Sequence, residues 1–186
     1  DLLVNSLRMR PDRIIVGEIR RKREAEVLFE AIHTGHSVYA TVHANDTRET
    51  ITRLTNPPID IPKTMLPAIS MIVVQYRNRR TGVRKTFQIA EILPDSEPNV
   101  LIQLDIRQGV LKKVAESKAL LSTIELFTGF TRNELNSSLK EKEYVLKWIV
   151  KNNINTVDGV GKAMAEYYTN KDNLMNYVSK NRLLNN

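Results

Sequence analysis

The side chains best suited to chemistry lie at the ends of two short apolar segments. Glu18 closes the first segment, residues 13–18, and His43 closes the second, residues 37–43. A carboxylate can orient or deprotonate an attacking water, and an imidazole or a hydroxyl can hydrogen-bond a phosphate oxygen. If both segments are neighbouring parallel strands, their carboxyl ends share the edge of the sheet where α/β proteins bind ligands. We therefore expect Glu18 and His43 to converge on one crevice.

Each of these residues also has a plain structural interpretation. A Glu that closes a strand often serves as a carboxylate near the start of the next helix, where the helix dipole favours it. His43 alone can simply be a polar residue at a strand end. The three histidines, His33, His36 and His43, have no cysteine or acidic companion and match no zinc spacing. We therefore expect no metal to be bound directly by this set.

The elements that must position these residues follow from periodicity and from stop signals. Residues 13–18 form a short apolar run that is typical of a fully buried parallel strand. Residues 37–43 mix small, apolar and β-branched residues, which favours a second strand. Between them, residues 24–34 have helical periodicity and end at Gly35. The pattern predicts a strand–helix–strand unit.

Two capping boxes mark the starts of further helices. Asp46 and Thr131 are each followed three residues later by a glutamate, which predicts helices over 46–56 and 132–152. The order of elements predicts an α/β unit followed by an α-helical module. The other predicted elements are a first helix before Pro11, a short helix at 63–69, hairpins at 71–92 and 100–114, helices at 117–127 and 157–168, and a tail helix. The apolar stripe expected in the core of the helical module is Leu135, Leu139, Leu146 and Ile149.

Composition narrows the class of protein. The chain has 186 residues, a net charge of +7 and no cysteine, which excludes a disulfide scaffold, an iron–sulfur protein and a cysteine-ligated zinc site. No apolar run reaches the ~20 residues that cross a bilayer. Residues 1–92 carry 12 Arg and 3 Lys against 10 acids. Because arginine suits phosphates and carboxylates, we expect anionic ligands or subunit contacts in that half.

Two longer motifs resemble those of a known family. Residues 7–20, LRMRPDRIIVGEIR, resemble the Walker B segment of the type II/IV secretion ATPase superfamily, and residues 34–44, TGHSVYATVHA, resemble its His box. The similarity continues through Arg53-Leu54, Pro57-Pro58 and residues 89–92. The C-terminal helices are similar, more loosely, to those of the archaeal branch.

The resemblance implies a fold and its divisions. The expected fold is α/β: the C-terminal half of a RecA-like P-loop ATPase domain, with a mainly parallel sheet and β-hairpins, followed by an α-helical module. Residues 1–92 would be the second half of the motor domain, 93–116 a connecting hairpin, and 117–186 the helical module.

The resemblance also implies roles for single residues. Glu18 matches the catalytic Walker B glutamate, and His43 matches the histidine that senses the γ-phosphate. The implied cofactors are ATP and Mg²⁺, which Glu18 would reach at most through a water. The residues expected to contact nucleotide, phosphate, a neighbouring subunit or acidic side chains are Thr41, Arg20, Arg8 and Arg10.

The family further implies partners and a whole-protein activity. We expect a homo-oligomer, a hexamer in the full-length protein, that works with an integral-membrane platform protein at the cytoplasmic face of the cell membrane, without nucleic acid. No G-x-x-x-x-G-K-[ST] loop occurs in the sequence, although the family has this phosphate-binding loop upstream of Walker B. We therefore expect a C-terminal piece of a motor that hydrolyses ATP for protein export or filament assembly, and that is inactive alone.

Two other functions fit parts of the sequence. Gly159 and Gly161 lie between two predicted helices, as in basic helix–hairpin–helix modules that bind nucleic-acid phosphates, although they can also simply loosen a first helical turn. The basic segment 77–85 is either a solvated hairpin end or a contact for acidic lipid or an acidic protein.

Overall fold

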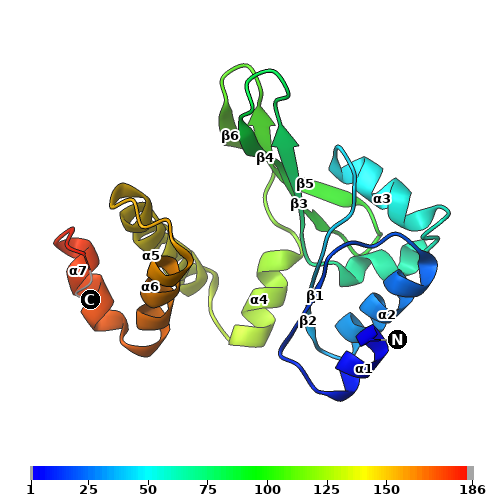
Figure 1. Cartoon of the computed structure of the whole chain (residues 1–186), viewed down its shortest axis with the longest axis horizontal. Coiled ribbons are helices and arrows are strands. Elements are labelled where there is room, and N and C mark those ends of the chain that lie inside the picture. Colours follow the sequence, from blue (N-terminus) through cyan, green and yellow to red (C-terminus); the bar gives the residue numbers. More distant parts are fainter. Residues whose placement is uncertain (1, 184–186) are drawn as a thin grey trace. The chain divides into compact units, whose positions relative to one another are not determined.

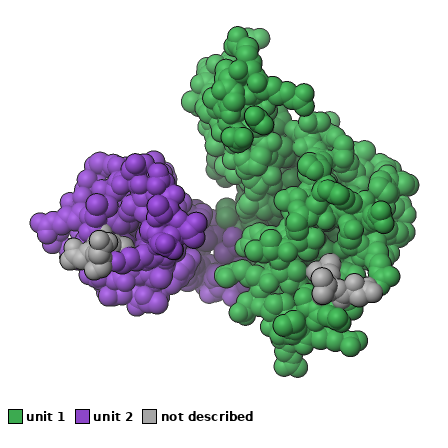
Figure 2. Space-filling view, in the orientation of Figure 1, with its two compact units in different colours: residues 1–123 green, residues 124–186 purple. Residues whose placement is uncertain are grey.

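The computed structural model describes residues 2–183, and the chain forms two compact units, residues 1–123 and 124–186 (Figure 2). Unit 1 contains two sheets and the helices that cover them, and unit 2 is helical. The mixed α/β unit and the helical module predicted from the sequence are therefore confirmed. Among residues 2–183, no helix has the length and apolar character needed to cross a bilayer.

The predicted strand–helix–strand unit is present. β1 (Arg13–Val16) and β2 (Ser37–Ala40) pair in parallel, and α2 (Lys22–His33) connects them. Gly35 follows α2 with a φ of +89°, a conformation that glycine adopts without strain. The expectation that the first strand is fully buried is wrong. Ile14 is buried, but Ile15 is 81% exposed, because alternate side chains of a strand point to opposite faces and only one face is covered here.

The two predicted hairpins are also present, and they join into one sheet (Figure 1). Its antiparallel strands follow chain order: β3 (Ile72–Arg77), β4 (Arg84–Ile92), β5 (Pro98–Asp105) and β6 (Val110–Lys113). The expectation of a mainly parallel sheet is therefore wrong for the described strands, in which β1–β2 is the parallel pair. Local patterning identified each hairpin, whereas the β4–β5 pairing depends on contacts between hairpins.

Three short helices complete the covering of unit 1: α1 (Leu2–Arg8), α3 (Thr47–Thr55) and a 3₁₀ helix, η1 (Lys63–Ala68). Asp46 caps α3 as predicted, because its side chain accepts the N–H of Glu49 at 2.7 Å. The core of unit 1 combines side chains from α2, α3, η1 and the second sheet; its buried members include Phe29, Leu54, Ile61, Leu66 and Val74.

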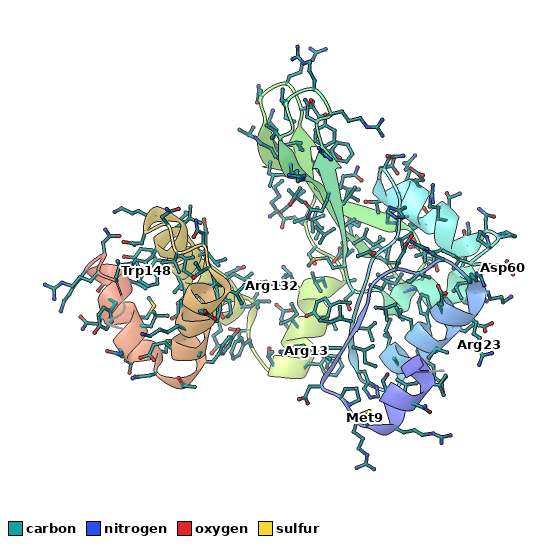
Figure 3. The ribbon with its side chains drawn as sticks, in the orientation of Figure 1. Met9, Arg13, Arg23, Asp60, Arg132 and Trp148 are labelled. Carbon is teal, nitrogen blue, oxygen red and sulfur yellow. The ribbon has the colours of Figure 1, made fainter. Side chains whose placement is uncertain are left out.

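Unit 2 packs three helices around one tryptophan. α5 (Arg132–Lys151), α6 (Val157–Thr169) and α7 (Lys171–Ser179) enclose Trp148, which lies among them in Figure 3. Thr131 and Glu134 form the predicted capping box at the start of α5. Of the stripe expected in the core, Leu135 and Ile149 are buried, whereas Leu139 and Leu146 are exposed, because the covered face of α5 is centred on Val145 and Trp148.

α4 (Leu120–Thr128) crosses the boundary between the two units and starts later than the predicted residue 117. Gly159 and Gly161 lie inside α6, and the N–H of Gly159 donates to the Thr156 hydroxyl at 3.1 Å. That N–H is therefore already used within the chain by the cap of α6.

Candidate functional site

The carboxyl ends of β1 and β2 hold Glu18 and His43 side by side. Beyond the last strand pair, the Thr41 hydroxyl donates to the Gly17 carbonyl and the N–H of Ile19 donates to the Thr41 carbonyl at 2.9 Å. These two bonds continue the pairing past the strands. As a result, Oε1 of Glu18 lies 3.2 Å from Nε2 of His43. The convergence expected from the sequence is confirmed as geometry.

Arg20 occupies the other oxygen of the same carboxylate. Its Nε and Nη2 lie 2.6 Å and 2.5 Å from Oε2 of Glu18. Residues two apart in an extended segment project to the same side, which brings these two side chains together. The sequence left nucleotide, phosphate, a neighbouring subunit and acidic side chains open as partners of Arg20. In the structure Arg20 contacts an acidic side chain. That this acid would be Glu18 itself was not foreseen.

The charges around Glu18 keep it ionised. The hydrogen bond from Arg20 lowers the pKa of Glu18 most, burial opposes it, and the charges of Arg20 and His43 lower it further. The same bond raises the pKa of Arg20. The Glu18 side chain is 21% exposed, compared with 82% for His43. The site is thus an ionised, partly shielded carboxylate between an open imidazole and a guanidinium.

The loop that carries Glu18 and Arg20 is fixed to the start of α2. Oε2 of Glu24 accepts hydrogen bonds from the backbone N–H groups of Arg20 at 2.8 Å and Arg21 at 3.2 Å. Nearby, Lys22 donates its N–H to the Pro58 carbonyl and forms an ion pair of 2.9 Å with Asp60. Glu24, and not Glu18, is therefore the carboxylate that accepts the N–H groups at the start of α2. The plain structural interpretation of Glu18, as a carboxylate that serves the start of the next helix, does not hold.

The loop that carries His43 is fixed to α3 and to the second sheet. The Glu49 carboxylate accepts hydrogen bonds of 2.8 Å from the backbone N–H and the side-chain amide of Asn45. The predicted capping box would instead have paired this carboxylate with the backbone N–H of the next residue, Asp46. The Thr47 N–H and hydroxyl both donate to Gln88 on β4 at 2.9 Å. Both loops of the site therefore have defined anchors.

A cavity of about 820 Å³ lies beside β2 and reaches the site. Its walls come from α2, from β2 and the following loop, and from the edge strand β3. Thr41 and His43 line it, and most of the other lining side chains are apolar. His43, one member of the polar pair, thus lies on the wall of a mostly apolar cavity, an arrangement common in ligand sites.

The remaining predicted residues lie apart from this pair. Arg8 ends α1, and Arg10 follows it with a φ of +50°; both are exposed, and no described contact joins either to Glu18 or His43. His33 and His36 bond through Nδ1 to carbonyls of α2, those of Phe29 at 2.8 Å and Ala31 at 3.2 Å. Within residues 2–183, no group of three or more His, Cys, Asp or Glu side chains is placed to hold a metal ion.

Residues 1–89 match the family model described as type II/IV secretion system protein. Over 175 residues the chain is 36% identical to the uncharacterized protein MJ1287 of Methanocaldococcus jannaschii, covering 90% of this chain and 64% of that one. It is 40% identical over 75 residues to the type IV pilus assembly ATPase PilB of Pseudomonas aeruginosa, covering 40% and 13%. Similarity to the protein transport protein HofB homolog of Escherichia coli is 39% over 71 residues, covering 38% and 15%. The chain thus spans less than two thirds of each of these relatives.

Proposed function

Because residues 1–89 match the model of the type II/IV secretion system protein family, we propose that the chain is part of a motor ATPase whose catalytic pair is Glu18 and His43. The observation that carries this proposal is the 3.2 Å contact between Oε1 of Glu18 and Nε2 of His43 at the carboxyl ends of two parallel strands. The relation to PilB and HofB supports a role in secretion or pilus assembly.

In this proposal, Glu18 prepares the attacking water and His43 detects the terminal phosphate. The lowered pKa of Glu18 keeps the carboxylate deprotonated, so that it can accept a hydrogen bond or a proton from water. His43 is open to solvent, and its Nε2 can donate to a phosphate oxygen when it is not engaged with Glu18. Loss of that phosphate returns His43 to Glu18, and the loop toward α3 carries the change into the unit.

Arg20 has a positioning role in this scheme. Its Nε donates a hydrogen bond to Oε2 of Glu18 and its Nη2 makes an ion-pair contact with the same oxygen, so a water can approach that oxygen only after Arg20 moves aside. An exposed guanidinium released in this way can bind phosphate or a neighbouring subunit. Thr41 would hold the edge of the site through Gly17, and Arg8 and Arg10 would serve subunit contacts.

The residues around Glu18 and His43 can form one side of a nucleotide-binding site, but not the whole site. MgATP supplies the phosphoryl group and the metal charge that stabilises its transfer. By the resemblance of its segment to Walker B, Glu18 would approach Mg²⁺ through a water and not as a ligand. The sequence contains no G-x-x-x-x-G-K-[ST] loop. We propose that the chain alone does not turn over ATP and that the longer protein supplies this loop.

The finer assignments are part of the same proposal. A RecA-like domain is supported by the β1–α2–β2 unit with its site at the strand ends. Hexamer formation, a platform protein in the membrane and a place at its cytoplasmic face are supported by the family match. Archaellum assembly is a third possible role for a motor of this kind.

The test is Glu18→Gln in the full-length motor. We expect ATP to bind as in the wild type while turnover falls by about 100-fold or more, because the amide cannot act as a base. Glu30→Gln, an exposed carboxylate on α2, is the matched control and should leave turnover unchanged. Turnover within a few-fold of wild type in the Glu18 variant would show that the base is misassigned.

A further inference from the structure

The turns of the two hairpins lie together at one end of the four-stranded sheet. The β3–β4 turn follows Arg77, and the β5–β6 turn follows Asp105; the antiparallel pairing of β4 with β5 brings both turns to the same end. Nζ of Lys85 donates to the Gly109 carbonyl at 2.5 Å and links the two. In Figure 1 this end extends away from the helices of unit 1. We call residues 77–85 and 105–113 the hairpin tips.

The hairpin tips hold most of the unbalanced positive charge of the protein. Lys112 pairs with Asp105, and Lys113 pairs with Glu116. Among the described residues, no carboxylate lies within ion-pair distance of six exposed cations: Arg77, Arg79, Arg80, Arg84, Lys85 and Arg107. Nitrogen-ended side chains project from this end of the sheet in Figure 3. Residues 77–85 and 105–113 together carry eight Lys or Arg side chains and one acid, Asp105, a balance of +7 that equals the net charge of the whole chain.

Exposed apolar side chains lie between these cations. Val83 precedes Arg84, Ile106 precedes Arg107, and Val110 and Leu111 precede Lys112. All four of these apolar side chains are exposed to solvent. A surface that alternates guanidinium groups with aliphatic side chains offers contacts both to phosphate and to hydrocarbon.

We propose that the hairpin tips bind the surface of a membrane rich in anionic phospholipid. The arginines would pair with lipid phosphates, and the aliphatic side chains would enter the boundary between headgroups and acyl chains. A nucleic acid offers the same phosphates but no apolar layer for Val83, Ile106 or Leu111. An acidic protein would likewise leave these side chains in water. The mixture of both side-chain types therefore favours lipid.

This binding does not depend on the chemistry proposed for Glu18, so it can be tested with the chain itself. The probes are vesicles of phosphatidylcholine alone and vesicles of phosphatidylcholine mixed equally with phosphatidylglycerol, sedimented with the protein. We expect binding to the mixed vesicles only, weakening as salt rises. Each basic residue at an anionic surface strengthens binding roughly fivefold. Arg79→Glu combined with Arg80→Glu should therefore weaken it by at least about 25-fold.

Two further variants separate local from general effects. Arg48→Glu with Lys140→Glu makes the same change of net charge at exposed sites outside the tips and should leave binding within about threefold of wild type. Ile106→Ser should weaken vesicle binding by roughly tenfold, through loss of apolar burial, with an unchanged circular dichroism spectrum.

Three results would overturn the proposal: unchanged vesicle binding in the Arg79/Arg80 variant, an equal loss in the Arg48/Lys140 control, or no effect of Ile106→Ser. Short duplex DNA and polyglutamate serve as competitors. If either binds the tips more tightly than the mixed vesicles, the surface recognises nucleic acid or acidic protein and not lipid.

Discussion

The carboxylate of Glu91, the next-to-last residue of β4, accepts a hydrogen bond of 2.8 Å from the backbone N–H of Leu120, the first residue of α4. Glu91 has no exposed surface. The same carboxylate accepts further hydrogen bonds from the side chains of Asn99 and Ser117 and from the N–H groups of Lys118 and Ala119. A strand residue thus caps a helix that lies far along the chain, and it fixes the start of the segment that leads from unit 1 to unit 2.

Replacing Glu91 with Gln should destabilise unit 1. The amide keeps the shape but turns its NH₂ group toward N–H donors, so buried donors lose their acceptor, at a cost of about 2–3 kcal/mol. Urea unfolding followed by circular dichroism measures this change, and hydrogen exchange of the Lys118 to Leu120 amides should accelerate. Glu97→Gln, an exposed acid in the β4–β5 turn, is the control and should change stability by less than about 0.5 kcal/mol. Equal stability of the two variants would contradict the capping role.

The same carboxylate predicts how stability depends on pH. Despite its burial, its hydrogen bonds lower the pKa of Glu91 from 4.5 to about 2. Because the folded-state pKa is depressed, the stabilisation is complete above pH 4.5 and is lost as pH falls toward about 2. Its size is roughly 3 kcal/mol. Urea unfolding at a series of pH values should show this loss in the wild type and a smaller loss in the Glu91→Gln variant; identical slopes would argue against it.

Tyr167→Phe should destabilise unit 2. The Tyr167 hydroxyl donates to Glu141 at 2.7 Å, and burial together with this acid raises the pKa of Tyr167 to about 12. Removing the hydroxyl leaves a partly buried carboxylate with Lys171 as its remaining partner, at a cost of about 1–2 kcal/mol. Trp148 is the single tryptophan and is buried in unit 2, so its fluorescence reports the unfolding of that unit. Tyr168→Phe, at a 75% exposed position, should have no measurable effect; a loss as large as that of Tyr167 would refute the assignment.

Two leucines in unit 2 should respond very differently to truncation. Leu174 on α7 has no exposed surface, whereas Leu146 on α5 is 54% exposed. Leu174→Ala should cost about 2–5 kcal/mol because it removes buried methyl groups and leaves a cavity. Leu146→Ala should cost less than about 1 kcal/mol. Trp148 fluorescence during urea unfolding measures both; a large effect at Leu146 would mean that a partner or another segment covers it.

Local signals predicted the elements well because their causes are local. Asp46 and Thr131 accept N–H groups three residues ahead, and Gly35 supplies the positive φ that ends α2. The site was predictable for the same reason, since two strands joined by one helix end at the same edge. Glu18 and His43 needed only that rule to be placed together.

The sequence by itself therefore determined the helices, the hairpins and the meeting of Glu18 with His43. The tertiary structure alone decided that Arg20 holds the second oxygen of Glu18, that Glu24 satisfies the start of α2, and that both hairpins share one sheet. It also decided that Glu91 is buried among donors that lie up to 29 residues away. Periodicity and capping patterns reflect interactions between residues within one helical turn or one strand, so they predict local structure. Which faces are covered, and which charges find partners, depends on segments that only folding brings together.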